Sequence, residues 1–285
     1  MHDHTHHHAL NDHWHGDSMA ALLDLDAEVH RSYLDALLDR VAGQLEREPR
    51  TIVDIGAGTG SGTIALAHRF PRAELIAVDQ STEMLDRLRG AARQNGFDTR
   101  VRTVEANLDS GWPAIGSADL VWAALSLHHI EDPDALLRQL LDVLNPDEVL
   151  VITEMAAQQR FLPDDIGIGT PGLEARCNEA AATQRRDMHP DWSDNLRLAG
   201  FDIADMWRIE IDIDPVDHTA RKYAHTALSR TREGLENHLS ADDLDALDRL
   251  ISGHGPESVL HRTDLAVRGA RTVWIARKNT KEESR

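Results

Sequence analysis

The sequence predicts an α/β fold in which a mostly parallel sheet is covered by helices on both faces. Short apolar runs alternate with helical patterns between residues 51 and 154, an order typical of consecutive βαβ units. The stretch Thr51–Gly62, TIVDIGAGTGSG, is an apolar run that breaks into alternating glycines. A second apolar run follows it and ends on an acid, Asp79. These features indicate a strand, a glycine turn, a helix and a second strand.

The N-terminal part is expected to be helical. Apolar residues recur every three or four positions between residues 17 and 47, and the helix could break near residues 24–26. We interpret residues 1–15 as a His-rich tail, residues 16–50 as a helical cap, and residues 51–285 as one main domain.

Strands and helices then alternate along the chain. Ser81 and Asp132 are expected N-cap residues, and Pro133 fits the first position of the helix that Asp132 begins. Asn145–Pro146 is expected to end that helix. The expected strands of this part are residues 51–55, 74–79, 100–105, 118–124 and 148–154.

Two insertions are expected in the second half of the domain. Residues 155–190 would follow the fifth strand at the carboxyl edge of the sheet, where ligands bind, so we interpret them as a lid. Thr170 is expected to cap a helix there that runs to about Arg186. The second insertion, about 215–262, is predicted to hold two helices, one of them capped by Ser240. Other expected elements are a helix over 192–199 and strands over 201–214 and 272–276.

Composition limits the classes of function. The 285-residue chain has a formal net charge of −19, which argues against nucleic acids and anionic membrane surfaces as partners. Its single cysteine, Cys177, excludes an intramolecular disulfide and suits a reducing cytoplasm. No apolar run approaches the ~20 residues of a membrane span. We therefore expect a cytoplasmic globular protein.

The glycine turn predicts a nucleoside ligand. Such a turn lets the backbone approach a ligand, and an acid at the end of the second strand accepts hydrogen bonds from ribose hydroxyls. The spacing Gly56-x-Gly58-x-Gly60 differs from the dinucleotide pattern, and no P-loop lysine follows. Asp54 is a poor neighbour for a pyrophosphate but a good one for a cationic group. A glycine turn without a ligand is the alternative.

Two segments indicate a family. VDIGAGTG resembles the first motif of class I S-adenosylmethionine-dependent methyltransferases, and DLVWAALSLHHIEDPDALLRQLLDVLNP resembles the corresponding block of the ubiquinone/menaquinone-type small-molecule methyltransferases. The resemblance implies a Rossmann-like, seven-stranded sheet whose last strand runs antiparallel between strands five and six. It also implies methyl transfer from S-adenosyl-L-methionine to a small-molecule acceptor, with S-adenosyl-L-homocysteine as product. A non-catalytic or catalytically diverted S-adenosylmethionine-binding protein is the alternative.

The resemblance also implies which residues bind the cofactor. Asp79 would bind the ribose hydroxyls, and Asn107 would accept a hydrogen bond from the adenine amino group, where the family commonly has an acid. Leu108 would supply a backbone contact, and Asp109 is the alternative if the register differs. The full expected set is Asp54, Gly56, Ala57, Gly58, Gly60, Asp79, Gln80, Met84, Asn107, Leu108, Ala123 and Ala124.

The acceptor side is less specific in sequence. His128 or His129 could act as a general base, because imidazole titrates near neutrality, or the pair could anchor the helix that follows. His189 and Asp191 are further candidates for a base, whereas Glu154 at the end of the fifth strand is interpreted as structural. The residues expected to face the substrate are Trp14, His15, Tyr33 and His129.

The histidine-rich N-terminus is the one candidate for a metal site. Seven of the 17 histidines lie in residues 1–15, and clustered imidazoles can chelate transition metals. A terminal segment without a specific metal is the alternative, and we assign no metal to the protein. The expected partner is a small-molecule substrate, and homodimer formation is left open.

Overall fold

The computed structural model describes residues 8–183, 191–214 and 216–279, with side chains from residue 19 onward. The chain divides into two compact units. We call the described residues of 30–157, 188–209 and 270–285 the sheet unit, and those of 1–29, 158–187 and 210–269 the helical unit.

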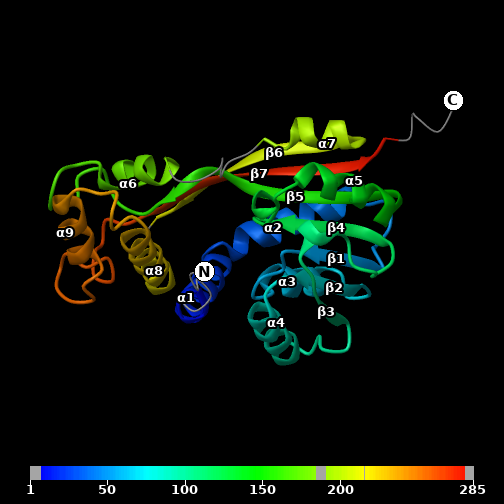
Figure 1. Ribbon diagram of the computed structural model, residues 1–285, viewed down its shortest axis with the longest axis horizontal. Helices are drawn as coiled ribbons and strands as arrows, with labels where there is room; N and C mark the ends of the chain where they lie inside the picture. Colours follow the sequence, from blue (N-terminus) through cyan, green and yellow to red (C-terminus); the bar gives the residue numbers. More distant parts are fainter. Residues whose placement is uncertain (1–7, 184–190, 215, 280–285) are drawn as a thin grey trace, which may run out of the picture. The chain divides into compact units, whose positions relative to one another are not determined.

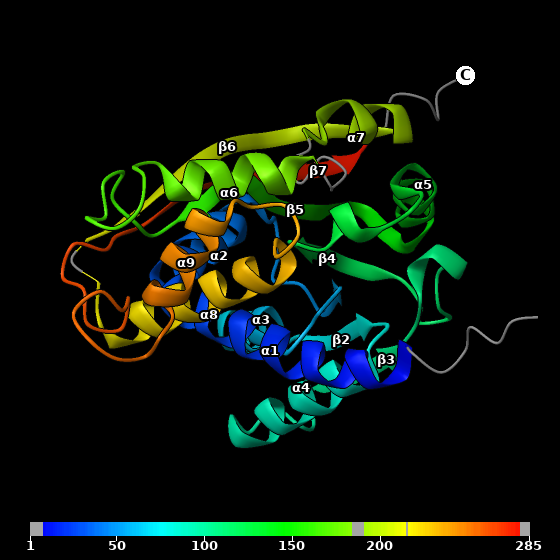
Figure 2. The same cartoon turned by 60° about the vertical axis from the view of Figure 1, so that its left-hand side comes forward.

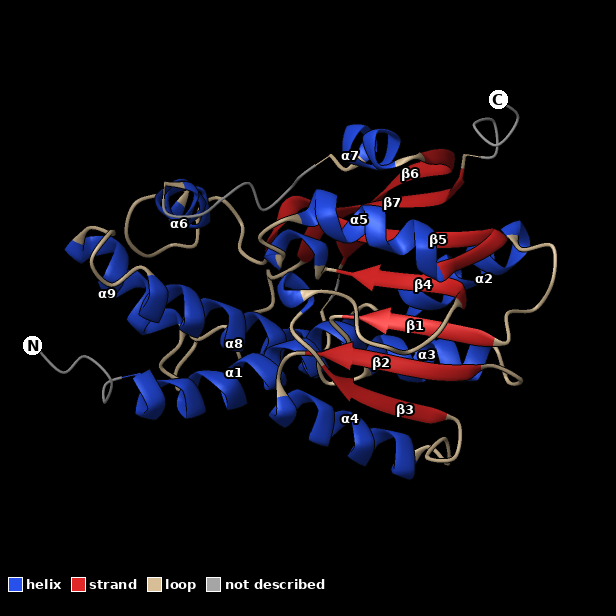
Figure 3. Ribbon diagram, turned by 45° about the vertical axis from the view of Figure 1, so that its right-hand side comes forward, coloured by secondary structure: helices blue, strands red, loops and turns tan. Residues whose placement is uncertain are grey.

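Seven strands form one sheet in the order β3-β2-β1-β4-β5-β7-β6 (Figure 1). Strands β1 to β5 pair in parallel, and the arrowheads of β1 to β4 point the same way in Figure 3. The last strand lies between β5 and β6 and is antiparallel to β5, which confirms the predicted topology. The strands are β1 (Thr51–Ile55), β2 (Glu74–Asp79), β3 (Val101–Glu105), β4 (Ala118–Ala124), β5 (Leu144–Arg160), β6 (Phe201–Ile213) and β7 (Val267–Lys278).

Helices of the sheet unit cover both faces of its sheet. On one face, apolar residues of α5 and α7 pack with Val53, Val121 and Leu150. On the other face, α2 and α3 pack against Leu120 and Val149. The helices of this unit are α2 (Arg31–Gln44), α3 (Ser61–Arg69), α4 (Thr82–Gln94), α5 (Pro133–Val143) and α7 (Ser193–Ala199).

The predicted N-caps are confirmed. Ser81 Oγ accepts a hydrogen bond from the Met84 N–H at 3.3 Å, and Asp132 Oδ1 accepts one from the Ala135 N–H at 2.9 Å. Each side chain thereby satisfies a backbone donor that has no partner within its helix. These caps fix where α4 and α5 begin, directly after the strand ends that form the candidate site.

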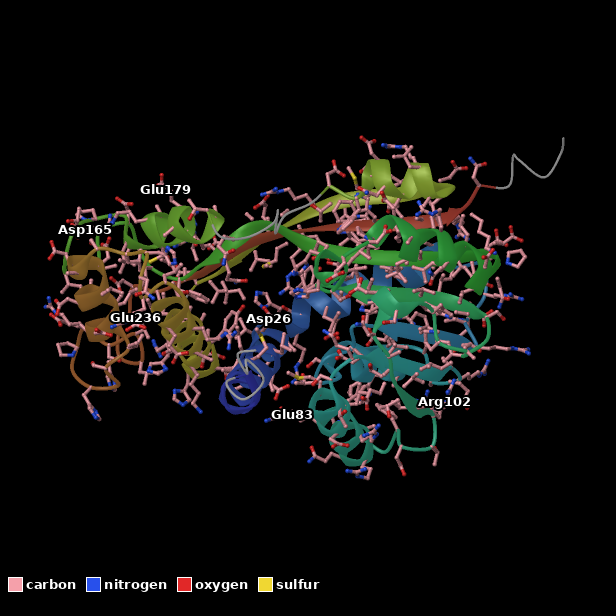
Figure 4. All side chains as sticks on the ribbon, in the orientation of Figure 1. Asp26, Glu83, Arg102, Asp165, Glu179 and Glu236 are labelled. Atoms are coloured by element: carbon pink, nitrogen blue, oxygen red, sulfur yellow. The ribbon has the colours of Figure 1, made fainter. Side chains whose placement is uncertain are left out.

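The helical unit contains α1 (His8–Val29), α6 (Leu173–Ala182), α8 (His218–Gly234) and α9 (Ala241–Leu250). Helix α1 packs along α8, and α8 packs on α9 (Figure 2). The Tyr223 hydroxyl donates a hydrogen bond to Asp26 at 2.7 Å, which joins α8 to α1. Ser240 caps α9 by accepting from the Asp243 N–H, as predicted. The labelled acids Asp165, Glu179 and Glu236 are exposed on this unit (Figure 4).

Two expected helix boundaries were wrong, and one was confirmed. The N-terminal helices break at His30, which coincides with the boundary between the units, rather than at residues 24–26. Helix α5 ends at Val143, directly before Asn145–Pro146, as predicted. The fifth strand begins at Leu144 rather than at residue 148, and the Asn145 amide donates to Asp119 at 2.8 Å within it. Helix α6 begins after Gly172, whose φ of 84° is incompatible with a right-handed helix that starts at Thr170.

Strands β5 and β7 are longer than expected. The fifth strand continues to Arg160 instead of ending at Glu154, and β7 covers Val267–Lys278 instead of residues 272–276. The two strands are neighbours in the sheet, so the additional length of each supplies backbone partners to the other. Because the two strands are far apart in the sequence, the local hydrophobic pattern does not predict this pairing.

Candidate functional site

The glycine turn closes directly over the end of β2. The N–H groups of Gly56 and Ala57 both donate to the Val78 carbonyl oxygen, at 2.8 and 3.1 Å. Gly56 has a φ of 66°, and a Cβ at this position would lie 2.3 Å from the Cβ of Ser126. Only glycine fits there, because any side chain would collide with the turn after β4.

Asp79 lies at the end of β2 and is held by two backbone donors. Its Oδ2 accepts a hydrogen bond from the Gly58 N–H and its Oδ1 accepts one from the Ser81 N–H, each at 2.8 Å. A carboxylate has about four acceptor positions, so one remains on each oxygen. The acid is therefore oriented by the turn and can still accept hydrogen bonds from a ligand with two adjacent hydroxyls.

Asp54 is buried between β1 and α3. Its Oδ2 accepts a hydrogen bond from the Thr63 hydroxyl at 2.6 Å, and the residue is 3% exposed. Burial raises the pKa of this carboxyl, the Thr63 hydrogen bond lowers it and the nearby charge of Asp79 raises it, so that the pKa is about 7. The buried carboxyl is therefore only partly ionised at neutral pH.

The expected adenine-binding segment follows β3. The Asn107 side-chain oxygen accepts a hydrogen bond from the Asp109 N–H at 2.9 Å and caps a short 3₁₀ turn, Leu108–Ser110. Asp109 in turn accepts from the Glu131 N–H at 2.8 Å. The Asn107 oxygen retains one acceptor position. Of the other expected residues, Gln80 is exposed, and Met84 and Leu108 are half-buried.

The turn after β4 is fixed by bonds to its neighbouring strands. The Leu125 N–H donates to the Thr153 carbonyl at 2.8 Å, and the Ser126 hydroxyl donates to the Ile55 carbonyl at 2.9 Å. Ala123 is buried and Ala124 half-buried just before this turn. Because Ile55 pairs with Ala123, these alanines lie beside the end of β1 and the glycine turn.

A buried carboxylate positions the His128–His129 pair. Glu154 is fully buried, and its Oε1 accepts hydrogen bonds from the backbone N–H groups of Leu127 and His128 at 3.1 and 3.3 Å. Its Oε2 lies 2.8 Å from His128 Nδ1. His129 is exposed and its ring lies 4.1 Å from that of His128, between centroids. This arrangement agrees with the anchoring interpretation of the pair and with a structural Glu154.

Tyr33 lies over the end of β5. Its hydroxyl and the Thr153 hydroxyl are 2.9 Å apart, and the guanidinium carbon of Arg271 lies 4.9 Å from the centroid of its ring. Tyr33 was expected near the substrate, but Thr153 and Arg271 were not. The sequence signal for Arg271 was a basic residue within an apolar strand. Its contact with Tyr33 joins β7 to α2, which are far apart in the sequence, so local patterns do not predict it.

For several of the expected site residues, the structure shows no position within a site. Residues 2–7 of the His-rich segment, the side chains of residues 8–15, including Trp14 and His15, and the whole of His189 lie outside the described part of the chain. Asp191 lies just before α7, and its Oδ1 accepts a hydrogen bond from the Ser193 N–H at 2.9 Å. Within residues 19–183, 191–214 and 216–279, no three His, Cys, Asp or Glu side chains form a metal-binding group. In the described part of the chain, no helix has the length and apolar character needed to cross a membrane.

Comparison with known proteins agrees with this geometry. Residues 52–147 match the family model described as a methyltransferase domain. The chain is 29% identical over 246 residues to the malonyl-[acyl-carrier protein] O-methyltransferase of Laribacter hongkongensis, covering 82% of this chain and 80% of that protein. It is 42% identical over 109 residues to the trans-aconitate 2-methyltransferase of Mycolicibacterium gilvum, covering 38% of each chain.

A solved structure shares the fold. The crystal structure of a methyltransferase candidate from Bacillus halodurans superposes with a TM-score of 0.55 at 17% sequence identity. The alignment covers 86% of this chain and 99% of the other. At this level of identity the comparison establishes the fold alone.

Fold, site and relatives together define a class I, S-adenosylmethionine-dependent methyltransferase. By their names, the relatives reported above methylate malonyl-[acyl-carrier protein] and trans-aconitate.

The residues of the glycine turn fit the cofactor of this class. The two free acceptor positions of Asp79 match a pair of ribose hydroxyls, and the glycines bring backbone rather than side chains to the ligand.

Proposed function

We propose that the sheet unit binds S-adenosyl-L-methionine at the carboxyl ends of β1, β2 and β4. The observation that carries this proposal is the Asp79 carboxylate, oriented by Gly58 and Ser81 with an acceptor position left on each oxygen. Asn107 and Leu108 would bind the adenine, and the glycine turn would lie against the amino-acid part. When bound, the cofactor supplies an activated methyl group on a sulfonium.

We further propose that the acceptor is a small carboxylic acid. Both groups of relatives reported above act, by name, on molecules with carboxyl groups, a malonyl thioester and trans-aconitate. Carboxyl groups ionise near pH 4, so at neutral pH the nucleophilic oxygen already has its lone pair and needs no base. The enzyme's contribution is then to position the acceptor and exclude water.

The environment of His128 supports a reaction without a base. Its imidazole is 4% exposed and bound through Nδ1 to a carboxylate that also holds two backbone N–H groups. An imidazole in this position stabilises the turn that borders the donor site. We propose that His128 and Glu154 are structural in this enzyme, and that neither transfers a proton in the reaction.

Calorimetry and a product assay test both parts of the proposal. The purified full chain should bind S-adenosyl-L-methionine and S-adenosyl-L-homocysteine in isothermal titration. Release of S-adenosyl-L-homocysteine is then measured with trans-aconitate, malonate, a malonyl thioester and related acids as acceptors. Phenols, quinones and amines are tested as alternative acceptors in the same assay. We expect turnover with acids.

Each part fails on a different result. No heat and no thermal shift with the cofactor would refute the donor site. Turnover confined to phenols or amines would refute the carboxylic acid and leave the donor site intact.

A further inference from the structure

Leu125 has a backbone conformation that leucine rarely adopts. It follows β4 directly, and its φ of 54° lies in the left-handed region. Glycine enters this region without strain and asparagine and aspartate tolerate it, whereas a branched apolar side chain is strained there. Strain of this kind persists only where the surrounding structure enforces it, and it is concentrated at functional sites.

Hydrogen bonds on both sides hold Leu125 in this conformation. Its own N–H donates to the Thr153 carbonyl oxygen at 2.8 Å. The hydroxyl of the next residue, Ser126, donates to the Ile55 carbonyl oxygen at 2.9 Å. One residue further along, the backbone N–H donates to the buried carboxylate of Glu154 at 3.1 Å. The chain is therefore bound to β1 and β5 around Leu125, and the residue keeps its strained φ.

Core packing does not explain the choice of leucine. The neighbouring residues Ala124 and Leu127 pack in two apolar cores of the sheet unit. Among the described residues, none of the four apolar cores includes Leu125, which is half-buried. A leucine usually stabilises a protein by being buried among apolar side chains. Leu125 thus combines an unfavourable backbone with an apolar side chain that the core does not use.

The position of Leu125 is beside the proposed donor site. Ala124, directly before it, pairs with Thr153 at the carboxyl edge of the sheet, where ligands bind in this type of fold. Ser126, directly after it, occupies the space beside Gly56 in the glycine turn. An acceptor that approaches the donor has a carbon skeleton as well as carboxyl groups, and a partly exposed leucine at this edge is an apolar surface for that skeleton.

We propose that Leu125 contacts the carbon skeleton of the acceptor beside the donor, and that its left-handed backbone directs the side chain to this contact. The inference rests on the proposed function and adds to it a residue that positions the acceptor. The strain at Leu125 then lowers the stability of the protein in exchange for the orientation of its substrate.

Three variants of the full-length protein separate strain from contact. Leu125→Gly and Leu125→Asn accept a positive φ but remove the apolar side chain. Leu125→Met keeps an apolar side chain of similar size and keeps the strain. Without ligands, we expect the glycine and asparagine variants to melt at the temperature of the unmodified chain or roughly 2–4 °C above it. The methionine variant should melt within about 1 °C of the unmodified chain.

Binding of the acceptor is measured without turnover. Isothermal titration gives the Kd for trans-aconitate, or for malonate if trans-aconitate is not turned over, on protein saturated with S-adenosyl-L-homocysteine. We expect Leu125→Gly and Leu125→Asn to raise this Kd roughly tenfold and to lower kcat/KM at least as much, because an apolar contact is lost. Leu125→Met should stay within about threefold. The Kd for S-adenosyl-L-homocysteine should change less than about threefold in every variant.

Asp147→Gly is the matched control. Of the described residues other than glycine, Asp147 and Leu125 have a positive φ, and that of Asp147 is 65°. Asp147 is exposed and precedes Val149, which pairs with Leu120, so it lies at the opposite end of the sheet from Leu125. The glycine relieves the backbone in the same way, so the melting temperature should be unchanged or higher. The Kd and kcat/KM for the acid should remain those of the unmodified chain.

Two results would overturn the inference. A Leu125→Gly variant that melts well below the unmodified chain, or does not fold, would show that the leucine stabilises the fold. A variant that keeps both the melting temperature and the original Kd for the acid would show that Leu125 does not contact the acceptor. The proposed function fails on other results, the absence of cofactor binding or of acid turnover in the unmodified chain, and these would overturn the role of Leu125 as well.

Discussion

The Gly58 N–H donates to Oδ2 of Asp79 at 2.8 Å and so ties the glycine turn to the end of the next strand. The second carboxylate oxygen is bound by the Ser81 N–H, at the start of α4. The acid therefore has one orientation before any ligand arrives. Preorganisation of this kind lowers the entropic cost of ordering the site when a ligand binds.

Asp79→Asn should weaken cofactor binding while the protein remains folded. The amide keeps one oxygen acceptor but loses the charge and replaces the second acceptor with a donor, which would face the Gly58 or Ser81 N–H or a ligand hydroxyl. We expect the Kd for S-adenosyl-L-methionine to rise at least about tenfold in isothermal titration. Asp86→Asn, on the exposed side of α4, is the control and should bind normally.

Asp54 should make the protein less stable as the pH rises. Its folded pKa is about 7, above the ordinary value of 3.8, so the folded state binds the proton more tightly than the unfolded state. Stability is then fully present below about pH 4, falls as the pH rises towards 7, and is constant above it. The shift corresponds to a free energy of unfolding of about 4 kcal/mol.

Asp54→Asn should remove this pH dependence. The free energy of unfolding is measured with urea at pH 5 and pH 8 for the variant and the unmodified chain. The variant should be the more stable protein at pH 8, and the difference should shrink at pH 5. The exposed Asp39→Asn is the control, with an expected change below about 0.5 kcal/mol. A parallel pH profile for Asp54→Asn and the unmodified chain would contradict the assignment.

Gly56→Ala should damage both stability and cofactor binding. The alanine would adopt a positive φ and its Cβ would lie 2.3 Å from the Ser126 Cβ, so the turn must move. We expect a loss of roughly 2 kcal/mol or more in the free energy of unfolding. Gly43→Ala, in α2 with no atom within 4 Å of the added Cβ, should instead stabilise the protein by about 0.5–1 kcal/mol.

Glu154→Gln should destabilise the protein strongly. Its Oε1 accepts from two backbone N–H groups and its Oε2 binds His128 Nδ1. The amide oxygen can still accept from both N–H groups, but the amide nitrogen only donates, so it binds Nδ1 only when that nitrogen carries no proton. We expect a loss of about 1–3 kcal/mol in urea denaturation, because the hydrogen bonds to a charged group are lost in a buried site. Glu105→Gln, whose exposed carboxylate accepts a hydrogen bond from the Thr82 hydroxyl, is the control. An unchanged midpoint for Glu154→Gln would show that the turn is stable without this anchor.

The sequence predicted the part of the fold whose signals are local. Strands β1, β2 and β4 begin and end where expected, because each is a short buried apolar run that ends at a turn. The caps Ser81 and Asp132 were also predictable, because a side chain of the right type precedes each helix. The topology of the sheet followed from the family resemblance.

The features that sequence reasoning missed depend on distant partners. The extension of β5 to Arg160 requires β7, which lies more than a hundred residues further along the chain. The contacts of Thr153 and Arg271 with Tyr33 arise from the packing of α2 on the sheet. The sequence shows Asn107 where the family commonly has an acid. The hydrogen bond from the Asp109 N–H to the Asn107 side-chain oxygen is visible only in the structure.

The contact between Gly56 and Ser126 has a consequence for how this enzyme could be altered. The Ser126 hydroxyl is bound to Ile55, and its Cβ occupies the space that any side chain at Gly56 would need. The two turns therefore behave as one rigid part, and a substitution in either one reaches the other.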